Sequence, residues 1–233
     1  AKAASPAAKV MLLCHPHNPV GRVWQEDELK QIAAICHKHD VLLVSDEIHG
    51  DIVYPPNSYL GMLEVAREYS DRIIMITSAG KSFGIPGLLD SFIHTPNAEL
   101  FKTLRSRIEA LHIDKANAFS NVAWECIYEH GAEWLVDLRQ YLQQSITALD
   151  SYLQTHISEV SFIKPEGTYQ IWLDFRKLGF DNEQLTRFLV DDAGIAVNAG
   201  FTYGPGGEGF MRMNIASPRS MLMEGMENLK KAI

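Results

Sequence analysis

Three short apolar runs are the feature that most constrains the fold of this chain. Residues 10–14 (VMLLC), 41–46 (VLLVSD) and 73–78 (IIMITS) each have the composition of a buried strand. Because the runs are apolar on both faces, they are typical of a parallel sheet with helices on both sides. Residues 26–39 (EDELKQIAAICHKH) have the spacing of an amphipathic helix. The pattern predicts an α/β fold with a mainly parallel sheet, and 91–95 (SFIHT) is a candidate further strand.

The pattern changes in the second half of the chain. Helical spacing dominates from about 97 to 156, and residues 132–157 suit one long helix. Short strands and helices then alternate, with strands expected at 160–164, 169–175, 195–200 and 210–216 and helices near 182–192 and at the end of the sequence. This mixture predicts a small α+β domain at 149–233, after a larger domain at 1–148.

Composition excludes several classes of function. The 233 residues carry a formal net charge of -8 and no basic cluster, so neither nucleic acid nor an anionic membrane is an expected partner. No apolar stretch is long enough to span a bilayer, and the first ten residues have no apolar signal core. The three widely separated cysteines are typical of a protein in the reducing cytoplasm. His15 and His17 have no third ligand at a suitable spacing, so no metal site is expected.

Polar residues follow all three predicted parallel strands. Asn18 follows the first strand, Asp46 ends the second, and Ser78 and Lys81 follow the third. Taken singly, each has a plain interpretation: an aspartate caps a helix, Asn-Pro marks a turn, and a lysine is a solvated charge. Ligands of open α/β sheets bind at the carboxyl edge of the strands. Polar residues after all three strands therefore predict one shared pocket.

A nucleotide-binding loop is not expected here, although residues 80–82 spell GKS. That motif needs a glycine six positions before its lysine, and this position is Met75. The glycine-rich stretch 204–209 (GPGGEG) precedes a predicted strand, whereas a dinucleotide fingerprint runs from a strand into a helix.

Five motifs in order resemble those of fold-type I pyridoxal-phosphate enzymes, of the class I/II aminotransferase superfamily. They are HPHNPVGRVW, SDEIHGDIVY, TSAGKSFGIPGL, PEGTYQIWLDF and GPGGEGFMRMNIASPR. Within that superfamily they look most like the aminotransferase-related C–S lyases, the cystathionine beta-lyase group. The resemblance implies part of a three-layer large domain, a small C-terminal domain, pyridoxal 5'-phosphate as cofactor, an amino acid substrate and a homodimer. Because such enzymes carry a long portion before these motifs, the chain resembles a C-terminal fragment of a longer enzyme.

The resemblance also implies roles for single residues. Lys81 matches the lysine that forms a Schiff base with the cofactor, and a lysine suits this role when its surroundings make the amine nucleophilic. Asp46 matches the carboxylate that pairs with the pyridine nitrogen. Asn18 matches the side chain that hydrogen-bonds the ring hydroxyl oxygen, and Ser78 matches a phosphate ligand. His49 stands where many aminotransferases carry a tyrosine that contacts the ring hydroxyl.

Two arginines in the last motif are expected to differ in role. Arg212 matches the arginine that binds the substrate α-carboxylate with two parallel hydrogen bonds. Arg219 is expected to brace the last helix. The Asn18–Pro19 bond is a candidate cis peptide, since such bonds are nearly confined to proline.

The function expected from this resemblance is β-elimination of cystathionine or related cysteine conjugates to a thiol, pyruvate and ammonia. Leu89 stands where many aminotransferases carry a phosphate-binding arginine, and together with His49 it favours a lyase over a transaminase. Two alternatives stay open. The same residues would serve an aminotransferase with a keto-acid acceptor, and a truncated chain without full activity would act as a binding module.

Overall fold

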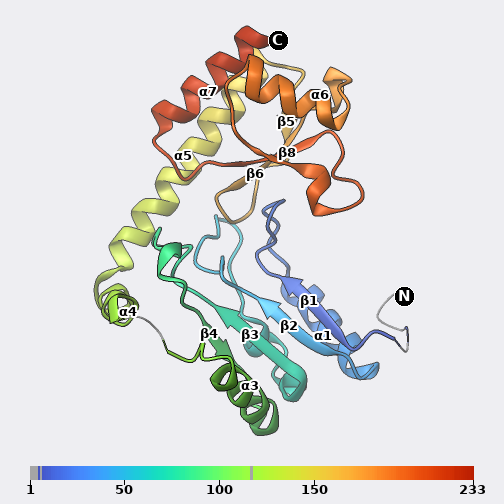
Figure 1. The fold of residues 1–233 in the computed structure, drawn as a ribbon, viewed down its shortest axis with the longest axis vertical. Coiled ribbons are helices and arrows are strands. Elements are labelled where there is room, and N and C mark those ends of the chain that lie inside the picture. Colours follow the sequence, from blue (N-terminus) through green and yellow to red (C-terminus); the bar gives the residue numbers. More distant parts are fainter. Residues whose placement is uncertain (1–4, 6, 116–117) are drawn as a thin grey trace. The chain divides into compact units, whose positions relative to one another are not determined.

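The computed structural model describes residue 5, residues 7–115 and residues 118–233. The chain divides into two compact units (Figure 1). Unit 1 holds the residues up to 17 together with 22–137, and unit 2 holds residues 18–21 together with 138–233. The division lies inside the long helix α5 (Ala132–His156), and the expected boundary after residue 148 also falls within this helix.

Unit 1 contains a four-stranded sheet in the order β1-β2-β3-β4 (Figure 1). Its strands are β1 (Val10–Cys14), β2 (Leu42–Asp46), β3 (Ile73–Thr77) and β4 (Phe92–His94). The first three strands are parallel, and β4 pairs with β3 in the antiparallel direction, which confirms the expected mainly parallel sheet. In register, Cys14 lies opposite Asp46, which lies opposite Ile76, so the three parallel strands end at one edge.

Helix α1 (Glu26–Lys38) and the short helix α2 (Met62–Val65) pack on one face of this sheet. In α1 the buried residues are Leu29, Ala33 and Cys36, whose spacing of four and three places them on one side of the helix. They form the core with Leu13, Leu43 and Ile73 from the strands and with Met62 and Ala66. Helix α1 has acidic residues in its first turn and basic residues in its last turn, and both sets of charges stabilise the helix by interacting favourably with its dipole.

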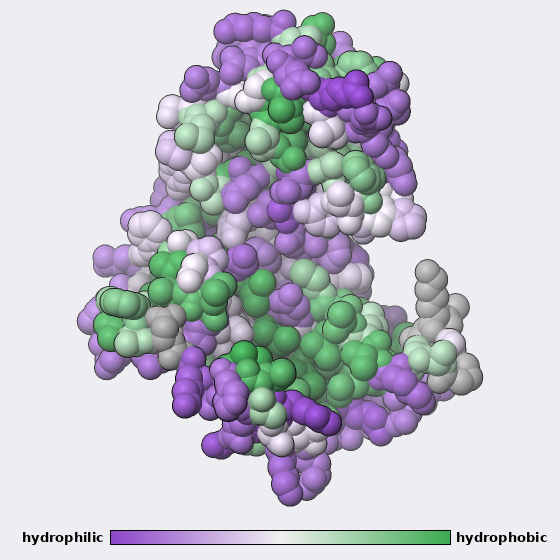
Figure 2. Space-filling model, viewed as in Figure 1, coloured by the Kyte–Doolittle hydropathy of each residue, from purple (hydrophilic) through white to green (hydrophobic). Residues whose placement is uncertain are grey.

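In the described part of the chain, the opposite face of the sheet is open at β1. Val10 is 52% and Leu12 79% exposed. Leu12 is in register with Val44 and Ile74, so apolar side chains of three strands share this face. Figure 2 shows hydrophobic side chains gathered over it. Among the described residues, the helices of unit 1 therefore cover only one face at β1, so the expected three-layer arrangement is present in part.

The helical region predicted at 97–156 divides into three helices. They are α3 (Ala98–Ala110), α4 (Ala118–His130) and α5. Asn97 begins α3, where its side chain accepts hydrogen bonds from the backbone N–H groups of Glu99 and Leu100. Two 3-10 turns, η2 (Arg67–Arg72) and η3 (Pro86–Leu88), precede β3 and β4.

Unit 2 contains an antiparallel sheet in the order β5-β6-β8-β7. Its strands are β5 (Ser161–Phe162), β6 (Gln170–Asp174), β7 (Asn198–Ala199) and β8 (Phe210–Asn214). Its further helices and turns are α6 (Asn182–Arg187), the π-turn Phe188–Asp192, α7 (Arg219–Ala232), η4 (Arg176–Leu178) and η6 (Gly200–Tyr203). Figure 1 shows α5, α6 and α7 beside this sheet, which confirms the expected α+β arrangement.

The two faces of the unit 2 sheet differ in chemistry. Ile171 and Leu173 of β6 are buried together with Met211 and Met213 of β8. The residues between them, which include Trp172 and Arg212, point to the other face because side chains alternate along a strand. One face is thus core, and the other carries the predicted substrate-binding arginine.

Arg219 braces the last helix, as predicted. Its guanidinium donates to the carbonyl of Tyr141, to Ser145 Oγ and to Gln144 Oε1 of α5, and it lies over the Tyr141 ring. These contacts join the start of α7 to the middle of α5. In the described residues, no helix is both long and apolar enough to cross a membrane.

Candidate active site

Lys81 lies in the tight turn that follows β3. The N–H of Phe83 donates to Ala79 O at 2.9 Å, and the N–H of Ile85 donates to Gly80 O at 3.0 Å. Lys81 lines a cavity of about 270 Å³, whose wall also includes Ser78, Leu89, Asp90 and Trp124. The structure thus brings Lys81 and Ser78 to one cavity. Leu89, which stands where many aminotransferases carry a phosphate-binding arginine, forms part of its wall.

The Ser78 hydroxyl is already engaged within this turn. Its Oγ donates to the carbonyl of Asp90 at 2.8 Å and accepts from the N–H of Gly80 at 3.1 Å. A hydroxyl has one hydrogen to donate, so it has to turn away from Asp90 before it can donate to a phosphate. Phosphate binding by Ser78 therefore stays a prediction.

Asp46 ends β2, and two backbone hydrogen bonds hold the strand ends beside it. The N–H of His15 donates to Asp46 O at 2.9 Å, and the N–H of Glu47 donates to Ile76 O at 2.8 Å. The Asp46 carboxylate accepts from the N–H of Ile48 at 3.3 Å. Three residues further on, His49 is buried in the turn. The structure therefore places Asp46 at the strand edge, as the sequence predicted, and buries His49 three residues beyond it.

A buried carboxyl group that the sequence did not single out lies next to Asp46. Glu47 is 2% exposed, and its carboxyl accepts from the Tyr59 hydroxyl and from the N–H of Met62. Tyr59 stacks on His15, whose Nε2 lies 3.1 Å from the carbonyl of Leu60. No pattern in the sequence distinguishes Glu47 from a surface glutamate, because its partners lie about a dozen residues away.

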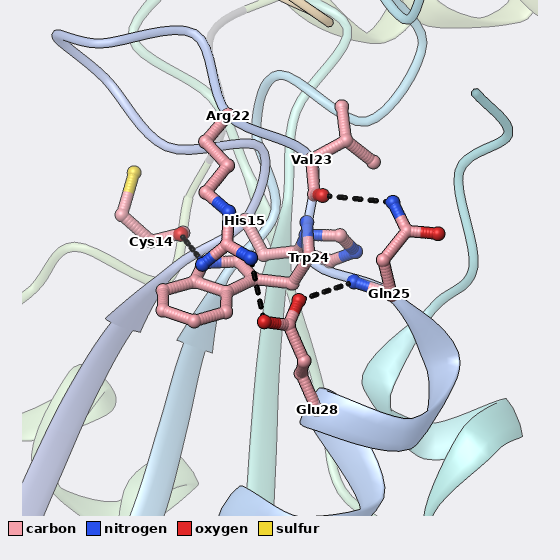
Figure 3. Close-up of polar contacts among 7 residues, drawn as sticks. All are labelled: Cys14, His15, Arg22, Val23, Trp24, Gln25 and Glu28. Atoms are coloured by element: carbon pink, nitrogen blue, oxygen red, sulfur yellow. Dashed lines mark hydrogen bonds and ion pairs between the residues drawn. The ribbon is translucent and has the colours of Figure 1, made fainter. Parts of the chain in front are cut away.

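Trp24 closes the base of the loop that follows β1 (Figure 3). Its indole N–H donates to Cys14 O at 3.1 Å, and its backbone N–H lies 3.4 Å from His15 Nδ1. The guanidinium of Arg22 lies 4.5 Å over the indole ring and forms an ion pair with Glu28 of α1. Both ends of the loop that carries Asn18 are therefore held in unit 1.

The tip of this loop, residues 18–21, belongs to unit 2. The Asn18–Pro19 bond is cis, as predicted. Gly21 has a φ of +74°, and a Cβ there would lie 2.3 Å from the Pro165 side chain, so the position requires glycine. The carbonyl of Gly21 accepts from the N–H groups of Glu166 and Gly167. Asn18 is thus placed by a loop that is bonded into unit 2.

Within unit 2, the structure brings Asn18 and Arg212 together. Arg212 Nη1 donates to Asn18 Oδ1 at 3.3 Å, and Nη2 donates to Asn198 Oδ1 at 2.7 Å. The guanidinium also lies 5.4 Å over the ring of Tyr203, whose edge meets Trp172. Asn198 and Tyr203 are residues that the sequence analysis missed as partners of this arginine.

The donors of Arg212 are not all satisfied. A guanidinium carries five N–H donors, and two of them bond to the asparagine side chains. Its Nε is buried and has no acceptor among the described residues. A buried donor without an acceptor costs about 1–3 kcal/mol, and an anionic ligand would relieve this cost. The six predicted site residues thus form two groups, four in unit 1 and two in unit 2.

The Glu47→Gln substitution should change how stability depends on pH. Burial raises the pKa of Glu47 above 4.5, and hydrogen bonds from Ser45, Tyr59 and Met62 oppose this only in part. The folded protein therefore holds this proton more tightly than the unfolded chain does. The contribution of Glu47 to stability is present below its ordinary pKa and is lost as pH rises through the raised one. We expect Glu47→Gln to remove this decrease in the free energy of unfolding as pH rises.

Urea unfolding of both proteins at several pH values between about 4 and 7 measures this difference. Glu64→Gln is the control, since Glu64 is exposed on neighbouring α2. The control should follow the wild-type curve at every pH. A Glu47→Gln curve that also runs parallel to wild type would show that the carboxyl group does not titrate differently on folding.

Comparison with known proteins relates this arrangement to a family. The sequence model of the family Aminotransferase class I and II matches residues 1–229. Cystathionine beta-lyase PatB of Bacillus subtilis (strain 168) is 31% identical over 232 residues, which cover 100% of this chain and 60% of that protein. Protein MalY of Escherichia coli (strain K12) is 35% identical over 231 residues, which cover 99% of this chain and 58% of that protein. The chain thus spans about 60% of the length of these curated relatives.

Solved structures agree with the sequence comparison. Cystalysin from Treponema denticola, which contains a pyridoxal 5'-phosphate cofactor, is 32% identical with a TM-score of 0.92 and covers 99% of this chain and 60% of its own. The PLP-bound C–S lyase from Staphylococcus hominis is 33% identical with a TM-score of 0.90, again over 99% and 60%. The expected fold is therefore confirmed. Because the family model spans nearly the whole sequence, the chain belongs to the class I and II aminotransferase family.

Proposed function

We propose that the protein carrying this chain is a pyridoxal-phosphate-dependent C–S lyase. The substrate is cystathionine or a related cysteine conjugate, which reacts with water to give a thiol, pyruvate and ammonia. PatB, which matches the whole chain, is named a cystathionine beta-lyase, and the Staphylococcus structure is named a C–S lyase. These names support the reaction class, and the residues of the site support the chemistry.

The observation that carries the proposal is the cavity that Lys81 shares with Ser78. It follows directly after a parallel strand, where ligands of open α/β sheets bind. A primary amine is the group that condenses with an aldehyde, and the hydroxyl and turn amides beside it suit a phosphate. The donor set in the described residues therefore fits pyridoxal 5'-phosphate.

Pyridoxal phosphate, when bound, supplies an electron sink for a carbanion at the substrate Cα. Lys81 Nζ would hold this group through its aldehyde carbon, and the same amine, once free, would take the α-proton as a general base. The Asp46 carboxylate keeps a proton on the pyridine nitrogen by its negative charge. The bond between Cβ and sulfur then breaks, and the sulfur leaves as a thiolate.

Arg212 binds the substrate α-carboxylate in this proposal. Its two bonds go to neutral amide oxygens, so no carboxylate among the described residues forms an ion pair with it. The same hydrogen bonds fix the plane of the guanidinium, which suits paired bonds to a carboxylate. Asn18 would therefore act in two ways in this proposal. Its Oδ1 orients Arg212, and its side chain is expected to contact the hydroxyl oxygen of the cofactor ring.

A class I/II aminotransferase is the second candidate, since the family includes such enzymes and uses the same lysine. Leu89 at the cavity wall and His49 in place of a tyrosine favour the lyase. The aminotransferase reaction needs a keto acid as acceptor, whereas β-elimination needs only water, so the two candidates differ in a required reactant.

We also propose that the protein works as a cytoplasmic homodimer. The open apolar face around Leu12 supports association between chains, because contiguous exposed apolar surface promotes such contacts. Sedimentation velocity over a range of concentrations should give a dimer. A single monomeric species at all concentrations would contradict the dimer.

The proposed reaction predicts release of thiol and pyruvate without a keto acid. The complete protein that carries this chain is mixed with pyridoxal phosphate and cystathionine, and both products are followed together. Sustained release at equal rates supports β-elimination. Turnover that begins only when a keto acid is added would instead support the aminotransferase.

Lys81→Ala should reduce this activity by several orders of magnitude, because it removes both the imine-forming amine and the base. Lys38→Ala is the matched control, since Lys38 is an exposed lysine in the last turn of α1. The control should retain wild-type activity. Normal turnover by Lys81→Ala would contradict the proposed role.

Arg212→Lys should raise the KM for the amino acid substrate about tenfold or more, because an ammonium cannot form the paired planar contact. The kcat should change less. Arg176→Lys is the control in the same unit, because Arg176 lies in η4 just after β6, is exposed and forms an ion pair with Asp174. Steady-state kinetics measure both, and a wild-type KM for Arg212→Lys would rule out carboxylate binding by Arg212.

A further inference from the structure

The residue that follows Lys81 has a specific partner from another strand connection. Ser82 is fully buried, and its hydroxyl donates to Asp51 Oδ2 at 2.7 Å. Asp51 lies 31 residues earlier, in the connection between β2 and α2. A hydroxyl-to-carboxylate bond of this length is of the stronger, charge-assisted kind. The bond therefore joins the Lys81 turn to the connection that follows Asp46.

The segment that presents Asp51 is itself held in place. Within it, the N–H of Gly50 donates to Glu47 O and the N–H of Ile52 donates to His49 O. Ile52 is fully buried directly after Asp51. A local turn on one side and a buried side chain on the other leave the Asp51 backbone little freedom.

The Glu47 carboxyl group anchors the far end of the same segment. It accepts from the Tyr59 hydroxyl and from the N–H of Met62 at 3.1 Å. The Tyr59 ring packs so closely on Gly50 that a Cβ there would lie 2.8 Å away. The segment from 47 to 62 is thus closed on itself, and the Asp51 carboxylate projects from a fixed support.

A reactive amine needs such a support more than most side chains do. The Lys81 amine stands at the end of a flexible four-carbon stem. The position of Nζ therefore depends on the backbone of the turn that carries the residue. The backbone hydrogen bonds within that turn, from Phe83 to Ala79 and from Ile85 to Gly80, join residues only four or five positions apart. A displacement of about 1 Å at a catalytic group can lower a rate by roughly 10²-fold.

We propose that Asp51 is a positioning residue for Lys81 and acts through the buried Ser82 hydroxyl. The proposal rests on the proposed function, in which Lys81 is the reactive amine. Asp51 touches neither substrate nor cofactor in it. It fixes the backbone next to Lys81, so that Nζ meets the cofactor aldehyde in a productive direction.

Four variants separate this role from a general loss of structure: Asp51→Ala, Asp51→Asn, Ser82→Ala and the double variant of Asp51→Ala with Ser82→Ala. The asparagine oxygen accepts from Ser82 as the carboxylate does, so Asp51→Asn should behave nearly as wild type. Asp27→Ala is the matched control, because Asp27 is an exposed aspartate in the first turn of α1. Ser82→Ala removes the same bond with a very small change in shape.

The first measurement is made without cofactor. Hydrogen exchange followed by mass spectrometry reports the protection of the segment 79–85 in the complete protein. Asp51→Ala and Ser82→Ala should each raise the exchange rate of this segment about tenfold, as expected for loss of a bond to a charged group. Asp51→Asn and Asp27→Ala should leave it unchanged.

The second measurement uses pyridoxal phosphate and borohydride, which traps the lysine adduct irreversibly. The rate of trapping at Lys81, read by peptide mass, should fall about tenfold in Asp51→Ala and in Ser82→Ala. The double variant should be no slower than either single variant, because both remove one bond. Asp51→Asn should trap within about threefold of wild type.

The outcomes distinguish the two proposals. If wild type shows no adduct at Lys81, the proposed function is wrong and the role of Asp51 falls with it. If wild type is trapped at Lys81 but Asp51→Ala matches it in both measurements, only the positioning role is wrong. An Asp51→Asn variant as slow as Asp51→Ala, or additive effects in the double variant, would likewise overturn positioning through Ser82.

Discussion

The register of three parallel strands is the constraint on which the rest of unit 1 depends. Because Cys14, Asp46 and Ile76 lie opposite one another, β1, β2 and β3 end at one edge. Backbone hydrogen bonds continue for one residue past this edge, at His15 and Glu47. A shift of one residue in β2 would turn Asp46 to the other face of the sheet. The position of every predicted site residue in unit 1 therefore follows from strand pairing before any side chain takes part.

Hydrogen-bonded side chains then fix the connections that leave this edge. Glu47 with Tyr59 closes the connection after β2, Asp51 with Ser82 joins it to the turn after β3, and Trp24 closes the loop after β1. Glu47 and Ser82 cost free energy to bury, and hydrogen bonds offset this cost only when the geometry is right. Alternative conformations of the connections would leave buried donors unsatisfied, so the network selects one arrangement of the loops that carry the candidate site.

Much of this could be predicted from the sequence, and the failures have physical causes. The bounds of β1 and the long helix α5 follow from local spacing, and the polar residues at the strand edge follow from topology. The partners of Glu47, Ser82 and Arg212 could not be predicted, because they depend on segments that meet only in the fold. The place of the open face, at Leu12, could not be predicted either, since an apolar strand looks the same whether or not a helix covers it.

Two arginines of unit 2 show how the partners of a guanidinium decide what it can bind. Arg176 is bonded to the Asp174 carboxylate, which cancels its charge and lowers the pKa of that carboxyl group. Arg212 is held by two neutral amide oxygens and by the face of Tyr203, and its buried Nε has no acceptor in the described residues. Both side chains are oriented, but in the described residues only Arg176 is paired with a carboxylate, whereas Arg212 has neutral partners and a buried Nε donor without an acceptor. An oriented guanidinium with donors left over is suited to an incoming anion, whereas one that is already neutralised serves the fold alone.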